Sequence, residues 1–181
     1  MHHHEKSRRF MPERPFPPYA FLPGRHPHPS RDADGHSHVA IGQEPVHGGF
    51  DESIRWGLDL FTHGYYWEAH EAWEEVWTDS ERGSAQWALS KGLILLAASG
   101  VKLRTGKAAA AIRHAKRASS LLRTVAGDTA KNFTALSGFS PCAIADIADR
   151  VALAPDVRTA ALGAPPEVVP DFAPLSLRHD S

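Results

Sequence analysis

The fold is decided around one aromatic and acidic stretch, Tyr65-Tyr66-Trp67-Glu68-Ala69-His70-Glu71-Ala72-Trp73-Glu74-Glu75-Val76-Trp77. A helix turns by about 100° per residue, so six of these side chains share one face: Tyr66, Ala69, His70, Trp73, Val76 and Trp77. Three glutamates fall on the other side: Glu68, Glu71 and Glu75. We expect Glu68 and Glu75 to be solvated and Glu71 to be within reach of a cation on a neighbouring helix. The stretch therefore predicts an amphipathic helix that buries tryptophan in a core.

The composition favours one cytoplasmic domain. The 181 residues are enough for a single domain with a core. Twenty Lys and Arg against 21 Asp and Glu remove the general electrostatic argument for nucleic acid or an anionic membrane as the main partner. The single cysteine, Cys142, permits no intramolecular disulfide and is typical of a reducing compartment. No apolar run reaches the roughly 20 residues that a membrane-spanning helix needs.

Proline and tryptophan divide the chain. All 14 prolines lie in the first 45 residues or from Pro141 onward, whereas the five tryptophans lie in the interval between. Because proline breaks helix interiors, a long interval without it is what packed helices require. We predict an N-terminal arm over 1–47, rich in Pro and His, a helical-bundle domain over 48–154 and an irregular tail over 155–181.

Periodic apolar residues and capping signals predict an all-α fold, a compact bundle of about four to five helices. The expected helices are 51–62, the Trp-rich stretch, 84–104, 107–125 and 140–153. Residues 92–101 are apolar nearly all round, so we expect the third of these helices to be the central one. No stretch shows the alternation of apolar and polar residues, bounded by hairpin turns, that is typical of a strand.

The arm allows two interpretations. Its Pro-rich composition predicts a flexible segment. Alternatively, Phe16, Tyr19 and Phe21 anchor it on the helices as an extended strap. The strap would bring His26, His28 or His36 near His70. The histidine pairs of the arm, His26 with His28 and His36 with His38, are capable of binding a metal ion. The histidines at positions 2–4 are either native or the remnant of a tag.

The motif Gly64-Tyr65-Tyr66-Trp67-Glu68-Ala69-His70-Glu71-Ala72-Trp73-Glu74, followed by Lys91-Gly92-Leu93-Ile94-Leu95-Leu96-Ala97-Ala98, resembles the domain of unknown function 309 family. The resemblance covers about residues 50–125 and implies a small all-helical fold. The arm resembles an extension seen in some longer members. No established activity or catalytic residue is implied, because the family name itself records an unknown function.

His70 and Glu74 are the central site candidates. At i and i+4 on a helix, an imidazole nitrogen and a carboxylate can bind one divalent ion or share a proton. A zinc site needs three or four protein ligands, which Glu71, His114 or the arm residues His26, His28 and His36 could complete. The alternative is a buried structural histidine whose ring is held by Glu74 or by a backbone carbonyl.

Other residues are expected to line a polar pocket around this pair: Trp67, Trp73 and Lys91. Lys91 either extends to solvent or pairs with Glu71 or Glu74. His114 either completes the site or caps a helix interface. The basic residues of 102–123 are expected to be solvated, with the acidic Trp-rich helix as a counter-charge.

Two classes of function follow. The first is a non-catalytic binding or assembly module for a protein or a small molecule, in which a homo-oligomer is also allowed. The alternative is a metal-dependent enzyme, such as a hydrolase, in which an ion activates water and His70 and Glu74 are catalytic. An incomplete ligand set favours the first class.

Overall fold

The computed structural model describes residues 9–36 and 48–176. Within these ranges it holds no strand but seven α-helices and one 3-10 helix: α2 Gly49–Thr62, α3 Tyr66–Asp79, α4 Ala85–Arg104, α5 Ala108–Leu122, α6 Gly127–Ser137, α7 Pro141–Leu153, η1 Pro170–Phe172 and α8 Ala173–Ser176. The all-α prediction is confirmed. The expected count of four to five helices is wrong, because the sequence pattern misses α6 and α8.

The physical reason why α6 is missed is that it buries little. Only Phe133 and Ser137 of this helix are buried, and its N-cap residue, Ala126, makes no side-chain hydrogen bond. Neither an apolar stripe nor a capping residue therefore marks it in the sequence. The other missed helix, α8, has four residues and directly follows η1.

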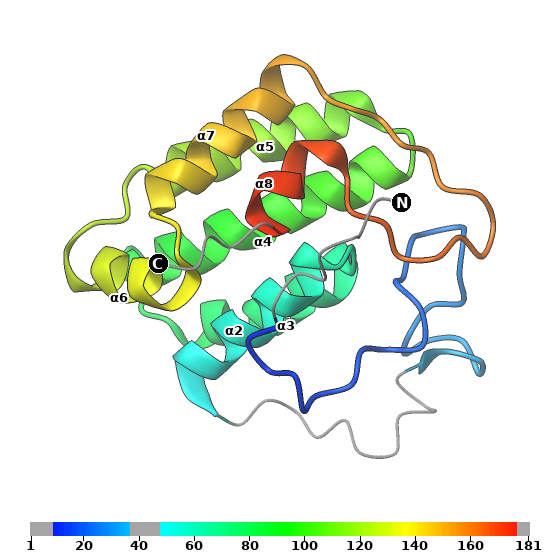
Figure 1. Cartoon of the computed structure of the whole chain (residues 1–181), viewed down its shortest axis with the longest axis horizontal. Helices are drawn as coiled ribbons and strands as arrows, with labels where there is room; N and C mark the ends of the chain where they lie inside the picture. The colour runs from blue at the N-terminus through cyan, green and yellow to red at the C-terminus, as the bar shows by residue number, and fades with distance from the viewer. Residues whose placement is uncertain (1–8, 37–47, 177–181) are drawn as a thin grey trace, which may run out of the picture.

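Helix α4 lies at the centre of the bundle (Figure 1), between α3 on one side and α5 on the other. Helix α2 packs on α3, and α7 packs on α5. The Ser84 hydroxyl accepts a hydrogen bond from the Trp87 N–H at 3.1 Å and caps the N-terminus of α4. Residues 93–97 of α4 are all buried, as its apolar sequence predicts.

Small residues bring α5 close to α4. Ala111, Ala115 and Ala118 are fully buried on the inward side of α5. The Ser99 hydroxyl of α4 donates a hydrogen bond to the Ala111 carbonyl at 3.0 Å. Side chains at the outer edges of α3 and α5 can consequently approach each other across α4.

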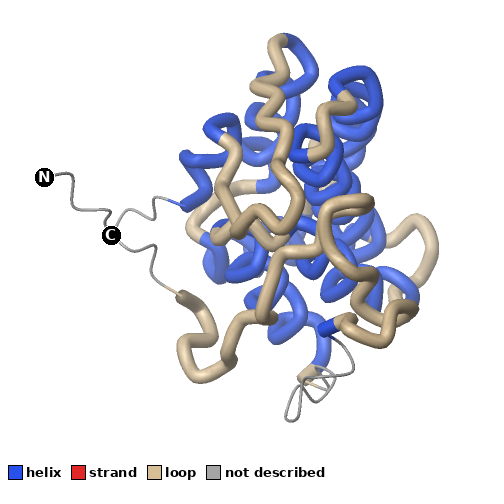
Figure 2. Tube along the Cα trace, turned by 90° about the vertical axis from the view of Figure 1, so that its right-hand side faces the viewer, coloured by secondary structure: helices blue, strands red, loops and turns tan. Residues whose placement is uncertain are grey.

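Residues 9–36 lie against α2 and α3, at the end of the bundle that faces the viewer in Figure 2. The Phe16 ring packs against Trp56, His63 and Tyr65, with centroid distances of 5.9, 4.8 and 4.9 Å. Phe21 is only 4 % exposed. The predicted arm boundaries, 1–47, include residues outside the described ranges and stay a prediction.

Two carboxylates from the helices hold the backbone of this segment. Asp59 of α2 accepts hydrogen bonds from the N–H groups of Phe10 and Met11, at 2.7 and 2.8 Å. Glu68 of α3 accepts one from the Phe21 N–H at 2.8 Å. Both carboxylates are buried, with residue exposures of 0 % and 6 %. The helices thus offer acceptors to an extended chain that has no strand partner of its own.

The chain is irregular over 155–169 and then forms η1 and α8. Phe172 is 1 % exposed and packs on Phe61 and Tyr66, at centroid distances of 4.9 and 5.6 Å. The tail also meets the arm, since the Gly163 N–H donates to the Arg25 carbonyl at 2.9 Å. In the described part of the chain, no helix is both long enough and apolar enough to cross a membrane.

Gly64 sets the turn between α2 and α3, and Gly64→Ala is expected to lower the free energy of unfolding by at least about 2 kcal/mol. Its φ is +86°, and an added Cβ would lie 2.6 Å from the backbone nitrogen of Glu167. Gly83→Ala is the matched control, because Gly83 has φ +85° but no atom within 4 Å of an added Cβ. Urea denaturation of both variants checks this. An equal loss of unfolding free energy in the two variants would show that the close approach of Gly64 to Glu167 contributes nothing to stability.

Candidate functional site

His70 has a buried ring nitrogen, Nδ1, that lacks a hydrogen-bond partner among the described residues. Its side chain is 25 % exposed, and Nδ1 lies 3.9 Å from Glu74 Oε2, beyond hydrogen-bond distance. The ring stacks on Trp67, with centroids 5.8 Å apart. Burial lowers the pKa of His70 below 6.5, Lys91 adds to this shift and Glu74 opposes it. The imidazole is therefore neutral at pH 7, with one nitrogen free to accept a hydrogen bond or bind a ligand.

Lys91 projects from α4 over the indole of Trp77 on α3. The distance from Nζ to the ring centroid is 3.8 Å, which is the geometry of a cation–π contact. The rings of Trp77 and Trp87 lie 6.2 Å apart. This contact replaces the predicted alternatives for Lys91, extension to solvent or pairing with Glu71 or Glu74.

His114 comes from α5 and, like His70, has a buried Nδ1 without a hydrogen-bond partner among the described residues. Burial lowers the pKa of His114, and the charges of Lys102, Arg117 and Arg113 lower it further. His70 also contributes to the lowered pKa of His114, so the two histidines are close enough to interact electrostatically. They belong to helices on opposite sides of α4 and are connected by its surface.

These side chains form one surface, which we call the α3–α5 face. It consists of His70, Glu71, Glu74 and Trp77 from α3, Trp87, Lys91 and Lys102 from α4, and Arg113, His114 and Arg117 from α5. The face combines half-buried aromatic rings, two neutral imidazoles and charges of both signs. Of the predicted site residues, it brings together His70, Glu71, Glu74, Lys91 and His114.

Glu68 was expected to be solvated, and the structure shows that this is wrong. Besides the Phe21 N–H, its Oε1 meets His36 Nε2 at 3.0 Å. The reason is that the arm covers this side of α3. Glu71 is exposed as a residue, but partial burial of its carboxyl group and the negative charge of Glu68 raise the pKa of Glu71, while His36 lowers it.

The arm histidines lie at different places. His36 contacts Glu68, and His28 lies edge-on to Trp67 at a centroid distance of 6.0 Å. His26 instead points to the tail, where Nε2 is 3.0 Å from the Ala164 carbonyl. Trp67 thus separates the arm histidines from His70, and none is shown in contact with the His70 ring. The histidines at 2–4 and His38 lie outside the described residues.

Trp73, predicted to line the pocket, lies in the core. It is fully buried, and its indole N–H points to the Ile54 carbonyl at 3.5 Å. Among the residues that the structure describes, no group of three or more His, Cys, Asp or Glu side chains is placed to hold a metal ion. The metal ligand set expected from the sequence stays a prediction.

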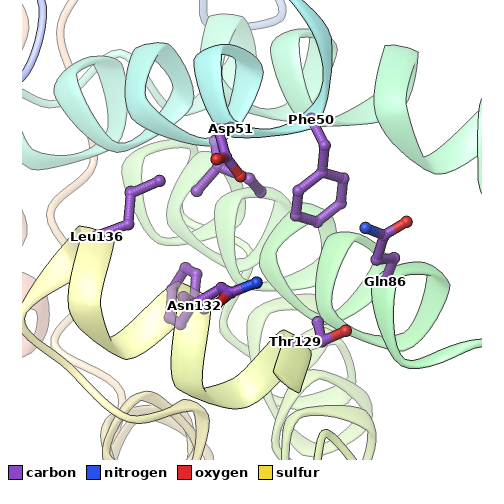
Figure 3. Close-up of a pocket in the computed structure, with 8 residues that line it drawn as sticks. Phe50, Asp51, Gln86, Thr129, Asn132 and Leu136 are labelled. Atoms are coloured by element: carbon purple, nitrogen blue, oxygen red, sulfur yellow. The ribbon is translucent and has the colours of Figure 1, made fainter. Parts of the chain in front are cut away.

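A separate cleft opens between α2, α4 and α6 (Figure 3), with a volume of about 320 Å³ including its open mouth. Phe50, Ile54 and Phe133 are among its apolar lining residues. Asp51, Gln86 and Asn132 supply polar groups at its rim. No residue of the α3–α5 face lines this cleft.

Asp59, which holds the arm on α2, has no part in the sequence-based prediction. It lies in the run Leu58-Asp59-Leu60-Phe61, and residues 56–62 of α2 are all buried. An acidic residue inside such a run has no solvated side to turn to, so it must find a partner from another segment. That was the available signal for a docking site on α2.

Residues 54–114 match the model of the family described as Domain of unknown function (DUF309). A search of curated proteins finds no match to this chain, and neither does a search of solved structures. The matched segment runs from α2 into α5 and includes His70, Glu74, Lys91 and His114. The family resemblance is thereby confirmed over residues 54–114, which carry a domain of this family.

Proposed function

We propose that this chain is a cytoplasmic, non-catalytic module that binds another protein through the α3–α5 face. The residue types support this proposal, because Trp and Arg carry much of the binding energy in protein interfaces. Trp77 and Trp87 are half-buried on this face, and Arg113 and Arg117 are exposed beside them. Half-buried rings need no rearrangement before a partner covers them.

One observation carries the proposal: the unpaired Nδ1 atoms of His70 and His114. A buried polar atom without a hydrogen bond costs about 1–3 kcal/mol, so such atoms usually meet a partner, an ion or water. Because the pKa values of both histidines are lowered, both rings are neutral at pH 7. Both atoms are closed to solvent, so a polar group of the partner would complete them through a water molecule or after a small turn of the ring.

Photo-crosslinking tests this function. A benzophenone amino acid at position 74 is expected to capture a discrete protein in the source cells, whereas the same group at position 75 is the matched control. Glu75 lies one residue further round α3, toward Arg14, and is outside the face. Crosslinking of the same proteins from both positions would contradict the proposal.

In the same assay, His70→Ala and Glu74→Gln are each expected to weaken capture by about tenfold, which corresponds to about 1.4 kcal/mol. For these variants the benzophenone amino acid replaces Trp87 instead of Glu74. Neither His70→Ala nor Glu74→Gln should lower the free energy of unfolding by more than about 1 kcal/mol. Unfolding of either variant, with no captured protein for the parent, would make His70 a structural residue.

A second candidate, the metal-dependent enzyme, is favoured by one distance. His70 Nδ1 and Glu74 Oε2 are 3.9 Å apart, close enough for both to turn toward a single divalent ion. Metal analysis of purified chain lacking the histidines at 2–4 tests it. One stoichiometric ion in the parent, lost in His70→Ala, would favour this candidate over the binding module.

A further inference from the structure

The acidic edge of the α3–α5 face is formed by two carboxylates of α3. Glu71 and Glu74 are both exposed. Within the described part of the chain, Glu74 has only the neutral His70 within ion-pair distance, and Glu71 has no ion pair. The two carboxylates also repel each other, which contributes to the raised pKa of Glu71.

The basic edge on the opposite side has the reverse character. Lys102, Arg113 and Arg117 surround His114, and their charges contribute to its lowered pKa. No ion pair to any of the three is found among the described residues, and Arg113 and Arg117 are exposed. The counter-charge expected from α3 therefore does not reach them as a direct ion pair.

Other arginines of this chain find acidic partners. Arg123, also on the α5 side, pairs with Asp146 and Asp149 of α7, each at 2.6 Å. Arg158 pairs with Asp156 at 2.8 Å. The chain as a whole is nearly neutral, with a formal charge of −1. Other exposed charges, such as Arg55 and Arg82, also lack an ion pair among the described residues, so what distinguishes the α3–α5 face is that its two signs are separated across α4.

We infer that the partner of this face is a second copy of the chain, related by a two-fold axis. The acidic edge of each copy then meets the basic edge of the other. A two-fold interface must be self-complementary, which a surface with one acidic and one basic edge satisfies. A purely acidic or purely basic partner would leave one edge unpaired. This inference rests on the proposed function and names its partner.

The test reverses the charge of each edge in variants of the full chain. One variant carries Glu71→Lys and Glu74→Lys, and the other carries Arg113→Glu and Arg117→Glu. Molar mass is measured by sedimentation and by native mass spectrometry. The parent is expected to be a dimer that dissociates as salt is added, since exposed ion pairs are screened. Each variant alone should dissociate with a constant raised by about 100-fold or more, because like charges then face each other.

Mixing the two variants is the decisive step. In the mixed pair every positive edge meets a negative edge, so the dimer should return with one copy of each variant. The control is Glu75→Lys with Lys116→Glu, a double reversal outside the two edges that should leave the dimer intact. Lys116 lies two turns before Arg123, on the α7 side of α5.

Three results would overturn the inference: a parent that is monomeric at every concentration, a dimer that survives both reversals, or a mixture that stays monomeric. The proposed function fails differently. If the benzophenone at position 74 captures a protein of another mass, the face binds a different partner and only self-association is wrong. If it captures nothing, the binding function itself is wrong.

Discussion

Trp73→Ala is expected to lower the free energy of unfolding by about 3–5 kcal/mol, the usual cost of truncating a buried aromatic side chain. Trp73 is fully buried between α2 and α3. Its ring lies 5.9 Å from that of Phe61, and a Cβ added to Gly57 would be 2.1 Å from its Nε1. Because α2 comes this close, no neighbouring side chain can simply expand into the space that the indole leaves.

Urea midpoints of the parent and the variant measure this loss. Trp87→Ala is the matched control, since it removes the same side chain from a half-buried position and should cost much less. Leu95→Ala, at a residue 5 % exposed on α4, should cost about 2–5 kcal/mol. Equal midpoints for Trp73→Ala and Trp87→Ala would mean that the phase assigned to α3 is wrong.

The helical spacing of the apolar residues in α3 predicts one of the two sides on which this helix is buried. Tyr66, Ala69 and Trp73 are at most 1 % exposed, as the helical spacing indicates. Glu68 is also buried, which the same spacing cannot reveal. A helical pattern shows which residues share a face, but what covers that face can be a distant segment. Here the cover is the arm, whose Phe21 lies 47 positions away from Glu68.

The candidate site was predictable to a similar extent. His70 and Glu74 are neighbours because residues four apart share a helix face. The position of His114 near them depends on how closely α5 packs on α4, and the three alanines of α5 give only a hint of it. The contact of Lys91 with Trp77 depends on a side-chain rotamer and on helix packing, neither of which has a sequence signal.

The attachment of the arm depends on buried charge. Asp59 is fully buried and accepts the N–H groups of Phe10 and Met11, while Arg9 Nε lies 3.6 Å from its Oδ2. Hydrogen bonds to a charged group stabilise more than neutral ones, because the alternative is a desolvated carboxylate. Phe16 then fills the aromatic site beside Trp56. The two contacts reinforce each other, since both order the same short segment.

Asp59→Ala is therefore expected to lower the free energy of unfolding by about 1.5–3 kcal/mol and to release the start of the arm. Hydrogen exchange of individual amides measures the release. The amides of Phe10 and Met11 should exchange much faster in the variant. Glu68→Ala should do the same for the Phe21 amide. The two variants should lose amide protection in different parts of the arm, because each carboxylate holds a different part.

Glu81→Ala is the control, because it removes an exposed carboxylate from the loop before α4 and should change neither stability nor arm exchange. Asp59→Asn separates charge from shape, since its amide nitrogen would face a backbone N–H, and a donor cannot bond to a donor. Its remaining oxygen can still accept one of the two N–H groups, so Asp59→Asn should cost less stability than Asp59→Ala. Exchange at free-peptide rates across residues 19–22 of the parent, with unchanged stability after deletion of residues 1–47, would show that the arm does not dock in solution.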